Sequence, residues 1–137
     1  MSYVVKAAIA NVNAKLFSFP AQKTMYGGKH IAVQDEIFVF ASENEGGKGL
    51  IARGVVTAAE ATPRKHGPKV RETPRVSITV RRVAAAKKSL GRTELKSFRD
   101  WDDGRPETEL CFKLYRQATN KVVGITQGTA AFLRRRF

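Results

Sequence analysis

The residues best suited to bind a ligand are basic, and many of them lie in one proline-rich stretch. Residues 62–74 contain three prolines and a cluster of Lys and Arg, a composition that disfavours a helix and a central strand. Basic side chains in such a loop can contact the phosphates of a nucleic acid. The predicted phosphate contacts are Arg64, Lys65, Lys69, Arg71, Arg75, Arg81 and Arg82. A solvated loop that only aids solubility is the alternative, and the net charge of +13 favours phosphate contact.

A second group of residues has the chemistry to bind a nucleobase. Trp101 and Tyr115 can stack on a base, because an aromatic face accepts any base. Gln117 and Asn120 follow Tyr115 closely, and their amides can pair with base edges. Structural roles remain open for all of these: Trp101 could cap the core, and the two amides could satisfy a turn. Phe98 is a weaker stacking candidate, because a place in the core is favoured for it.

One acidic cluster could bind a divalent ion or carry out acid–base chemistry. Its members are Asp100, Asp102, Asp103, Glu107 and Glu109. Their spacing matches no metal-binding motif, so turn residues that balance Arg99 and Arg105 are the favoured interpretation. No metal site is expected.

The remaining candidates for catalysis or nucleotide binding are weak. His30 and His66 are far apart in the sequence, and neither has a nucleophile at a telling spacing. The glycine-containing segments 27–29 and 46–48 lack the Walker spacing, which excludes a phosphate loop for ATP. We therefore expect no catalytic residue and no cofactor.

Length and charge define the class of protein. The chain has 137 residues, 42% of them hydrophobic, which is enough for a single domain spanning 1–137. Twenty-five Lys and Arg against 12 Asp and Glu attract polyanions, so nucleic acid, either DNA or RNA, is the expected partner. A membrane is not expected, because the sequence has no long apolar run, no amphipathic lysine-rich helix and no lipidation motif.

The N-terminus and the single cysteine indicate the compartment. Residues 1–6 lack the charged start, the apolar stretch and the cleavage site of a signal peptide. Cys111 is the only cysteine, so it cannot form an internal disulfide, and its apolar neighbours predict a buried thiol. These features predict a cytoplasmic protein.

Four short runs predict the main strands. The run at 75–83 is the clearest, because apolar and polar residues alternate along it. Residues 36–41 and 50–57 flank a glycine-rich turn at 43–49, which predicts an antiparallel hairpin. Residues 109–115 are apolar and aromatic enough to predict a fourth strand.

Other segments predict shorter elements. Residues 3–10 predict a strand, followed by a short helix that Asn11 or Asn13 caps and that Pro20 stops after Phe19. Residues 93–98 predict a helical turn and residues 122–125 a strand. Residues 127–136 predict a helix opened by Thr126. The predicted fold class is α+β, mainly β: a small antiparallel pseudobarrel with two or three short helices.

Two consecutive segments resemble a known superfamily. The order of residues 34–42 and then 49–56 is similar to that of PUA-like domains, especially the EVE, ASCH and YTH groups, and the resemblance covers mainly residues 3–83. It implies a pseudobarrel whose open face holds a nucleobase, often a modified one, beside a basic surface. By position, Tyr26, Gly27, Gly28 and Lys29 match the loop that borders the pocket in EVE-like domains, and Ser42 matches the polar residue that ends the central strand.

The favoured function is a nucleic-acid-binding module that docks through a basic face and holds a base, modified or not, in a barrel pocket. The predicted pocket residues are Tyr26, Gly27, Gly28, Lys29, Ser42, Trp101, Tyr115, Gln117 and Asn120. One alternative is a small hydrolase acting on RNA or a modified nucleoside, as some ASCH-like relatives are. A lysine near Tyr26 or a carboxylate such as Glu109 would then do the chemistry. The other alternative is a structural RNA-binding protein without a base pocket.

Overall fold

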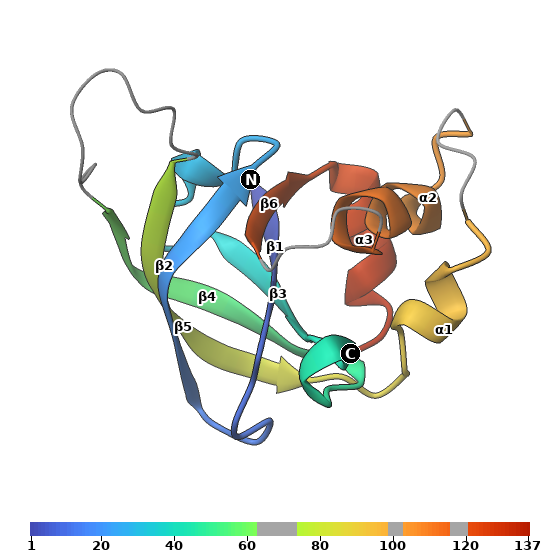
Figure 1. Ribbon diagram of the computed structural model, residues 1–137, viewed down its shortest axis with the longest axis horizontal. Helices are drawn as coiled ribbons and strands as arrows, with labels where there is room; N and C mark the ends of the chain where they lie inside the picture. Colours follow the sequence, from blue (N-terminus) through green and yellow to red (C-terminus); the bar gives the residue numbers. More distant parts are fainter. Residues whose placement is uncertain (63–73, 99–102, 116–120) are drawn as a thin grey trace.

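The computed structural model describes residues 1–62, 74–98, 103–115 and 121–137 (Figure 1). The strands are β1 (Ser2–Ala7), β2 (Leu16–Met25), β3 (Glu36–Ala41), β4 (Gly49–Ala61), β5 (Arg75–Ala85) and β6 (Lys121–Ile125). The α-helices are α1 (Arg92–Leu95), α2 (Pro106–Leu110) and α3 (Gln127–Arg134). The shorter turns are η1 (Gly28–His30), η2 (Glu43–Glu45) and the π-helical turn η3 (Cys111–Tyr115), which continues α2.

The six strands form a closed barrel in the order β1-β3-β4-β5-β2-β6. The pairs β3–β4, β4–β5, β2–β5 and β1–β6 are antiparallel, whereas β1–β3 and β2–β6 are parallel. The prediction of a small, mainly β barrel with short helices is therefore confirmed. Its sheet is mixed and not wholly antiparallel, because two strand pairs that are distant in sequence run in the same direction.

Two hydrophobic cores hold the domain together. Val5 and Ile78 belong to the core inside the barrel. Val4 points to the other face of β1, as strand alternation requires, and joins a second core with Leu114 and Leu133. The helices lie together on one side of the barrel, at the right of Figure 1, and cover this second core.

The strand predicted at 109–115 is wrong, because α2 and η3 occupy these residues. Leu110 and Leu114 are both buried in the second core, and their four-residue spacing puts them on one face of a helix. Pro106 is at the start of α2, where its missing N–H is not needed. Packing against α3 thus overrides the β-prone composition of this run.

The helix predicted between Asn11 and Phe19 is also wrong, because β2 begins at Leu16. Phe17 and Phe19 are buried inside the barrel, and the residues between and beside them are exposed, which is the period of a strand. Pro20 lies within β2, where the register with β5 shifts between Phe19 and Gln22. Such an irregularity tolerates a residue without an N–H.

The remaining predicted elements are confirmed with small shifts of their ends. The first strand ends at Ala7, the predicted helical turn is α1, and β6 and α3 are present. Thr126 caps α3 as predicted, because its hydroxyl accepts a hydrogen bond from the Thr129 N–H at 3.2 Å. None of the helices in the described ranges is long and apolar enough to cross a membrane.

Candidate functional site

Strand β6 closes the barrel between β1 and β2 over only part of their length. Strand β6 lies between them, but it pairs with β2 only from Lys23 to Met25. On this side of the barrel, the described part of the chain contains no strand that pairs with Leu16–Gln22 of β2. A pocket of about 550 Å³, here called the opening pocket, lies at this gap. Its lining comes from the end of β1 (Ala7, Ala8), from β2 (Ser18 to Lys23), from the turn after β3 (Ser42, Asn44, Glu45) and from Arg75.

Ser42 lines this pocket and has a buried hydroxyl. The residue is 1% exposed, and among the described residues its Oγ atom has no hydrogen-bond partner. Its backbone is fixed, because its N–H donates to the Ala7 carbonyl at 2.9 Å and its carbonyl accepts from the Gly47 N–H at 2.8 Å. Buried polar groups are nearly always hydrogen-bonded, so this hydroxyl is suited to a ligand that supplies the missing partner.

The rest of the pocket lining combines apolar surface with a few polar groups. Ala7 and Phe19 are buried apolar residues of the barrel interior. Gln22 and Asn44 are held by local hydrogen bonds: the Gln22 amide donates to the Pro20 carbonyl, and the Asn44 amide oxygen accepts from Arg92. Pockets for small organic groups have this mixture of apolar walls and a few oriented polar atoms.

Four cations lie opposite one another on neighbouring strands, and two of them, Lys23 and Arg75, line the opening pocket. Lys6 of β1 is opposite Lys121 of β6, Lys121 is opposite Lys23 of β2, and Lys23 is opposite Arg75 of β5. We call these four residues the cation row. Like charges that face each other on neighbouring strands destabilise a sheet. An anion bound beside the row would remove this repulsion.

The two inner lysines of the cation row have lowered pKa values. Lys6 is 4% exposed and Lys121 1% exposed, and burial is the main cause of both shifts. The positive charges of Lys6 and Lys23 lower the pKa of Lys121 further. Lys6 keeps partners, since its ammonium donates to the Leu114 carbonyl at 2.8 Å and lies 4.4 Å from the centre of the Tyr115 ring. The carboxylate of Glu43 acts in the opposite direction and raises the pKa of Lys6, so a negative charge beside the row is favourable.

The structure brings a few of the predicted site residues to this region. Ser42, a predicted pocket residue, and Arg75, a predicted phosphate contact, both line the opening pocket. Tyr115 does not line the pocket; its hydroxyl donates to Glu43 at 3.0 Å, and the Lys6 ammonium lies over its ring. Desolvation of the phenol and the neighbouring carboxylate of Glu43 raise the Tyr115 pKa far above its ordinary value.

The loop predicted to border the pocket lies elsewhere. Neither Tyr26 nor Lys29 is among the residues lining the opening pocket. The Tyr26 ring packs edge-on against Phe112 of η3, with a centroid distance of 6.1 Å. Gly27 has φ +82°, which favours glycine, and a side chain at Gly28 would collide with the backbone of β6. The backbone conformation thus accounts for Gly27, and close packing against β6 accounts for Gly28.

Of the predicted phosphate contacts that the structure describes, Arg75 lies apart from Arg81 and Arg82. Arg81 and Arg82 are at the opposite end of β5 from Arg75, roughly 20 Å along the strand at 3.3 Å per residue. The other predicted site residues lie outside the described residues: Arg64, Lys65, Lys69, Arg71, Trp101, Gln117 and Asn120.

Glu109 has a structural role at the start of α3. Its carboxylate accepts hydrogen bonds from the hydroxyls of Thr126 and Thr129, both at 2.7 Å, and from Lys113 at 3.0 Å. Burial raises the pKa of Glu109, but these hydrogen bonds outweigh burial and hold the pKa below its ordinary value. Within the described ranges, no three His, Cys, Asp or Glu side chains come together in a way that could hold a metal ion.

Comparison with known proteins gives a match in structure alone. No family model matches the chain, and no curated protein is significantly similar in sequence. The DUF55 domain of human thymocyte nuclear protein 1 has a TM-score of 0.64 and 16% identity, over 96% of this chain and 95% of that one. The human THYN1 protein in complex with DNA containing 5-methylcytosine also gives a TM-score of 0.64 and 16% identity, over 96% and 94% of the two chains.

A third similar structure is a hypothetical protein from Leishmania major, with a TM-score of 0.61 and 17% identity, over 98% of this chain and 92% of that one. At these identities the likeness establishes the fold. Nearly the whole chain thus has the fold of DUF55 domains, which are EVE-like and PUA-like, and this confirms the resemblance noted in the sequence.

Proposed function

We propose that this protein is a nucleic-acid-binding module that holds one nucleobase in the opening pocket. The observation that carries the proposal is the Ser42 hydroxyl, which is buried and has no partner among the described residues. A base presents hydrogen-bond donors and acceptors along its edge, so it can supply the missing hydrogen bond. The apolar surface of Ala7 and Phe19 then contacts its flat face.

The cation row can bind the phosphates that are attached to a base. Lys23 and Arg75 line the same pocket as Ser42, so one nucleotide can place its base at the hydroxyl and its phosphate at these two cations. Burial is the main cause of the lowered pKa values of Lys6 and Lys121, and the charges of Lys6 and Lys23 lower the pKa of Lys121 further. A phosphate offsets these positive charges, and its counterions are released to solvent.

A base can enter the pocket only after it leaves the stack. Proteins that read or modify single bases bind them from single strands or flip them out of a duplex, at a cost of a few kcal/mol. The cation row supplies electrostatic attraction that offsets this cost. Either DNA or RNA satisfies this chemistry.

A modified cytosine is the base we favour. The similar human THYN1 structure was obtained with DNA that contains 5-methylcytosine. A methyl group on a base gains from apolar contact, and Ala7, Ala8 and Phe19 supply apolar atoms around the opening pocket. This preference adds only the energy of a small apolar contact, so unmodified bases should bind more weakly and not be excluded.

The hydrolase alternative receives no support from the carboxylate predicted for it. Glu109 already accepts hydrogen bonds from three side chains at the start of α3. Lys113, which the sequence did not single out, lies over the Tyr26 ring and donates to Glu109 and to the Gly124 carbonyl. Both groups are part of the packing between the helices and the barrel.

The test is the substitution Ser42→Ala, measured on oligonucleotides that carry 5-methylcytosine, cytosine or an abasic site at one position. The loss of one hydrogen bond, worth about 1 kcal/mol, should weaken binding of the base-containing strands roughly fivefold. Binding of the abasic strand should not change. Ser97→Ala, at an exposed position, is the matched control. Equal affinities of the parent for all three strands would contradict the proposal.

A further inference from the structure

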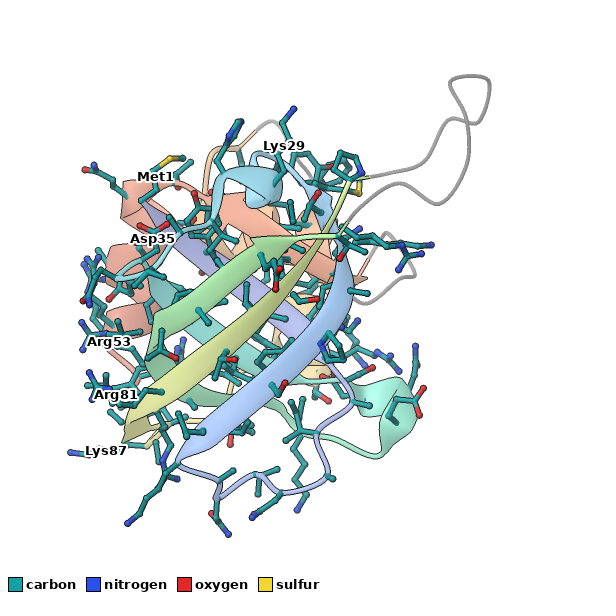
Figure 2. All side chains as sticks on the ribbon, turned by 90° about the vertical axis from the view of Figure 1, so that its left-hand side faces the viewer. Met1, Lys29, Asp35, Arg53, Arg81 and Lys87 are labelled. Carbon is teal, nitrogen blue, oxygen red and sulfur yellow. The ribbon has the colours of Figure 1, made fainter. Side chains whose placement is uncertain are left out.

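The described residues include a second dense group of cations, on the side of the barrel away from the opening pocket. It consists of Arg53, Arg81, Lys87, Lys88, Arg134, Arg135 and Arg136, which we call the far-side surface. Within the ring of six strands, β4 is opposite β6, so the outward side chain of Arg53 points away from the opening. Figure 2 shows Arg53, Arg81 and Lys87 following one another along one edge of the barrel.

Specific contacts join these residues into one surface. Arg53 and Arg134 both bind Glu36, with their Nε atoms 2.7 and 3.0 Å from its Oε2. The backbone N–H of Lys87 donates to the Arg136 carbonyl at 2.7 Å, which joins the end of β5 to the end of α3. The ends of two distant segments are thus fixed side by side, and their charges add.

The charges of the far-side surface are largely uncompensated. Among the described residues, the only carboxylate in an ion pair with this surface is Glu36. Arg81, Lys87, Lys88 and Arg135 are exposed, and no described acidic side chain forms a salt bridge with them. Seven cations against one carboxylate make a strong positive potential, which attracts a polyanion.

From this charge and placement we infer that the far-side surface binds a second segment of nucleic acid, so that one protein bridges two segments. Five of the seven cations are arginines, whose planar forks match phosphate oxygens. Arg53 and Arg134 are held in place by Glu36, which reduces the entropy lost on binding. The inference rests on the proposed function only for the class of polymer, since the far-side surface includes no residue of the opening pocket.

A duplex cannot reach both surfaces at once if it is short. Twelve base pairs span roughly 40 Å, and DNA of that length is stiff because its persistence length is about 150 base pairs. The experiment therefore uses two such duplexes, one fixed to beads and one fluorescent. Capture of the fluorescent duplex on the beads measures bridging, and sedimentation with excess duplex gives the number bound per protein chain.

The variant Lys87→Gln/Lys88→Gln removes two charges from the far-side surface, and Lys48→Gln/Lys96→Gln removes two exposed charges elsewhere. We expect the parent and the control to bridge and to bind two duplexes per chain. The far-side variant should bridge roughly tenfold more weakly, with its first duplex bound nearly as before.

A parent that binds one duplex per chain, or a far-side variant that bridges like the parent, would overturn the inference. Bridging that depends on Lys87 and Lys88 but not on the presence of a base would support it, while contradicting the proposed function. The experiments can therefore contradict either proposal without contradicting the other.

Discussion

The cation row and the Glu36 cluster use the same residue types in opposite ways. In the Glu36 cluster, Arg53, Arg134 and Ser2 surround one carboxylate at 2.6–3.0 Å and tie α3 to three strands of the barrel. In the cation row, basic residues face one another across neighbouring strands beside a pocket. Paired charges stabilise the fold, whereas crowded like charges lower stability until a ligand binds. Charge composition alone does not distinguish the two, but strand register does.

The largest expected effect is on stability, from Glu36→Gln. Removal of the carboxylate charge leaves Arg53 and Arg134 facing each other without compensation. We expect the free energy of unfolding to fall by about 2 kcal/mol, because Glu36 is mostly buried but its partners Arg53 and Arg134 are 37% and 47% exposed, which screens the charges. Urea denaturation followed by circular dichroism measures this. The control is Glu60→Gln on the exposed part of β4, and a loss below about 0.5 kcal/mol in Glu36→Gln would contradict the structural role.

The same cluster predicts how stability depends on pH. Burial raises the pKa of Glu36, but hydrogen bonds from Arg134, Arg53 and Ser2 outweigh it and lower the pKa to about 2. A carboxylate whose pKa is lower in the folded state contributes stability above its unfolded pKa of about 4.5, and that stability is lost as pH falls toward 2. Since the group is partly exposed, we expect a loss of about 2 kcal/mol over this range.

Glu36→Gln should remove most of this pH dependence, because glutamine does not titrate. Unfolding curves of the parent and the variant at pH 5, 4 and 3 make the comparison. Parallel loss of stability in both proteins would assign the acid sensitivity to other carboxylates.

The cation row should show the opposite behaviour. Lys23→Gln/Arg75→Gln removes two charges that face each other, so stability should change by less than about 0.5 kcal/mol. Binding of nucleic acid should weaken by about 1–2 kcal/mol, and the salt dependence of log K should decrease by roughly 0.7 to 0.9 for each lost phosphate contact. Lys48→Gln/Lys96→Gln carries the same charge change. An equal loss of binding in that variant would show that the affinity depends on net charge alone and not on the position of Lys23 and Arg75.

Much of the barrel could be predicted because its strands carry local signals. The alternation at 75–83 and the turn at 43–49 depend only on neighbouring residues, and β3, β4 and β5 follow from them. The prediction of a strand at 109–115 failed because Leu110 and Leu114 are helical as a result of packing in one core with Leu133, which is distant in sequence. The prediction of a helix before Phe19 failed because proline normally ends an element. Here Pro20 lies within β2, at a register shift.

The candidate site was only partly predictable, for a related reason. Ser42 was found through the resemblance of its segment to PUA-like domains, and Arg75 through its place beside a basic loop. Lys6, Lys23 and Lys121 come from three separate segments, and one parallel and one antiparallel pairing with β6 align them. No local pattern signals such a pairing. The separation of Arg75 from Arg81 likewise needs the orientation of β5 in the barrel.

The most direct test of the base pocket is to fill it. Ala8 is an exposed residue that lines the opening pocket, so Ala8→Trp should block entry of a base without disturbing either core. Ala58→Trp, at another exposed alanine, is the control. The measurement is the ratio of Kd values for a strand with an abasic site and the same strand with 5-methylcytosine. We predict a ratio of roughly five or more for the parent and for Ala58→Trp, equivalent to about 1 kcal/mol, and a ratio near one for Ala8→Trp. An undiminished ratio in folded Ala8→Trp would show that the base binds elsewhere.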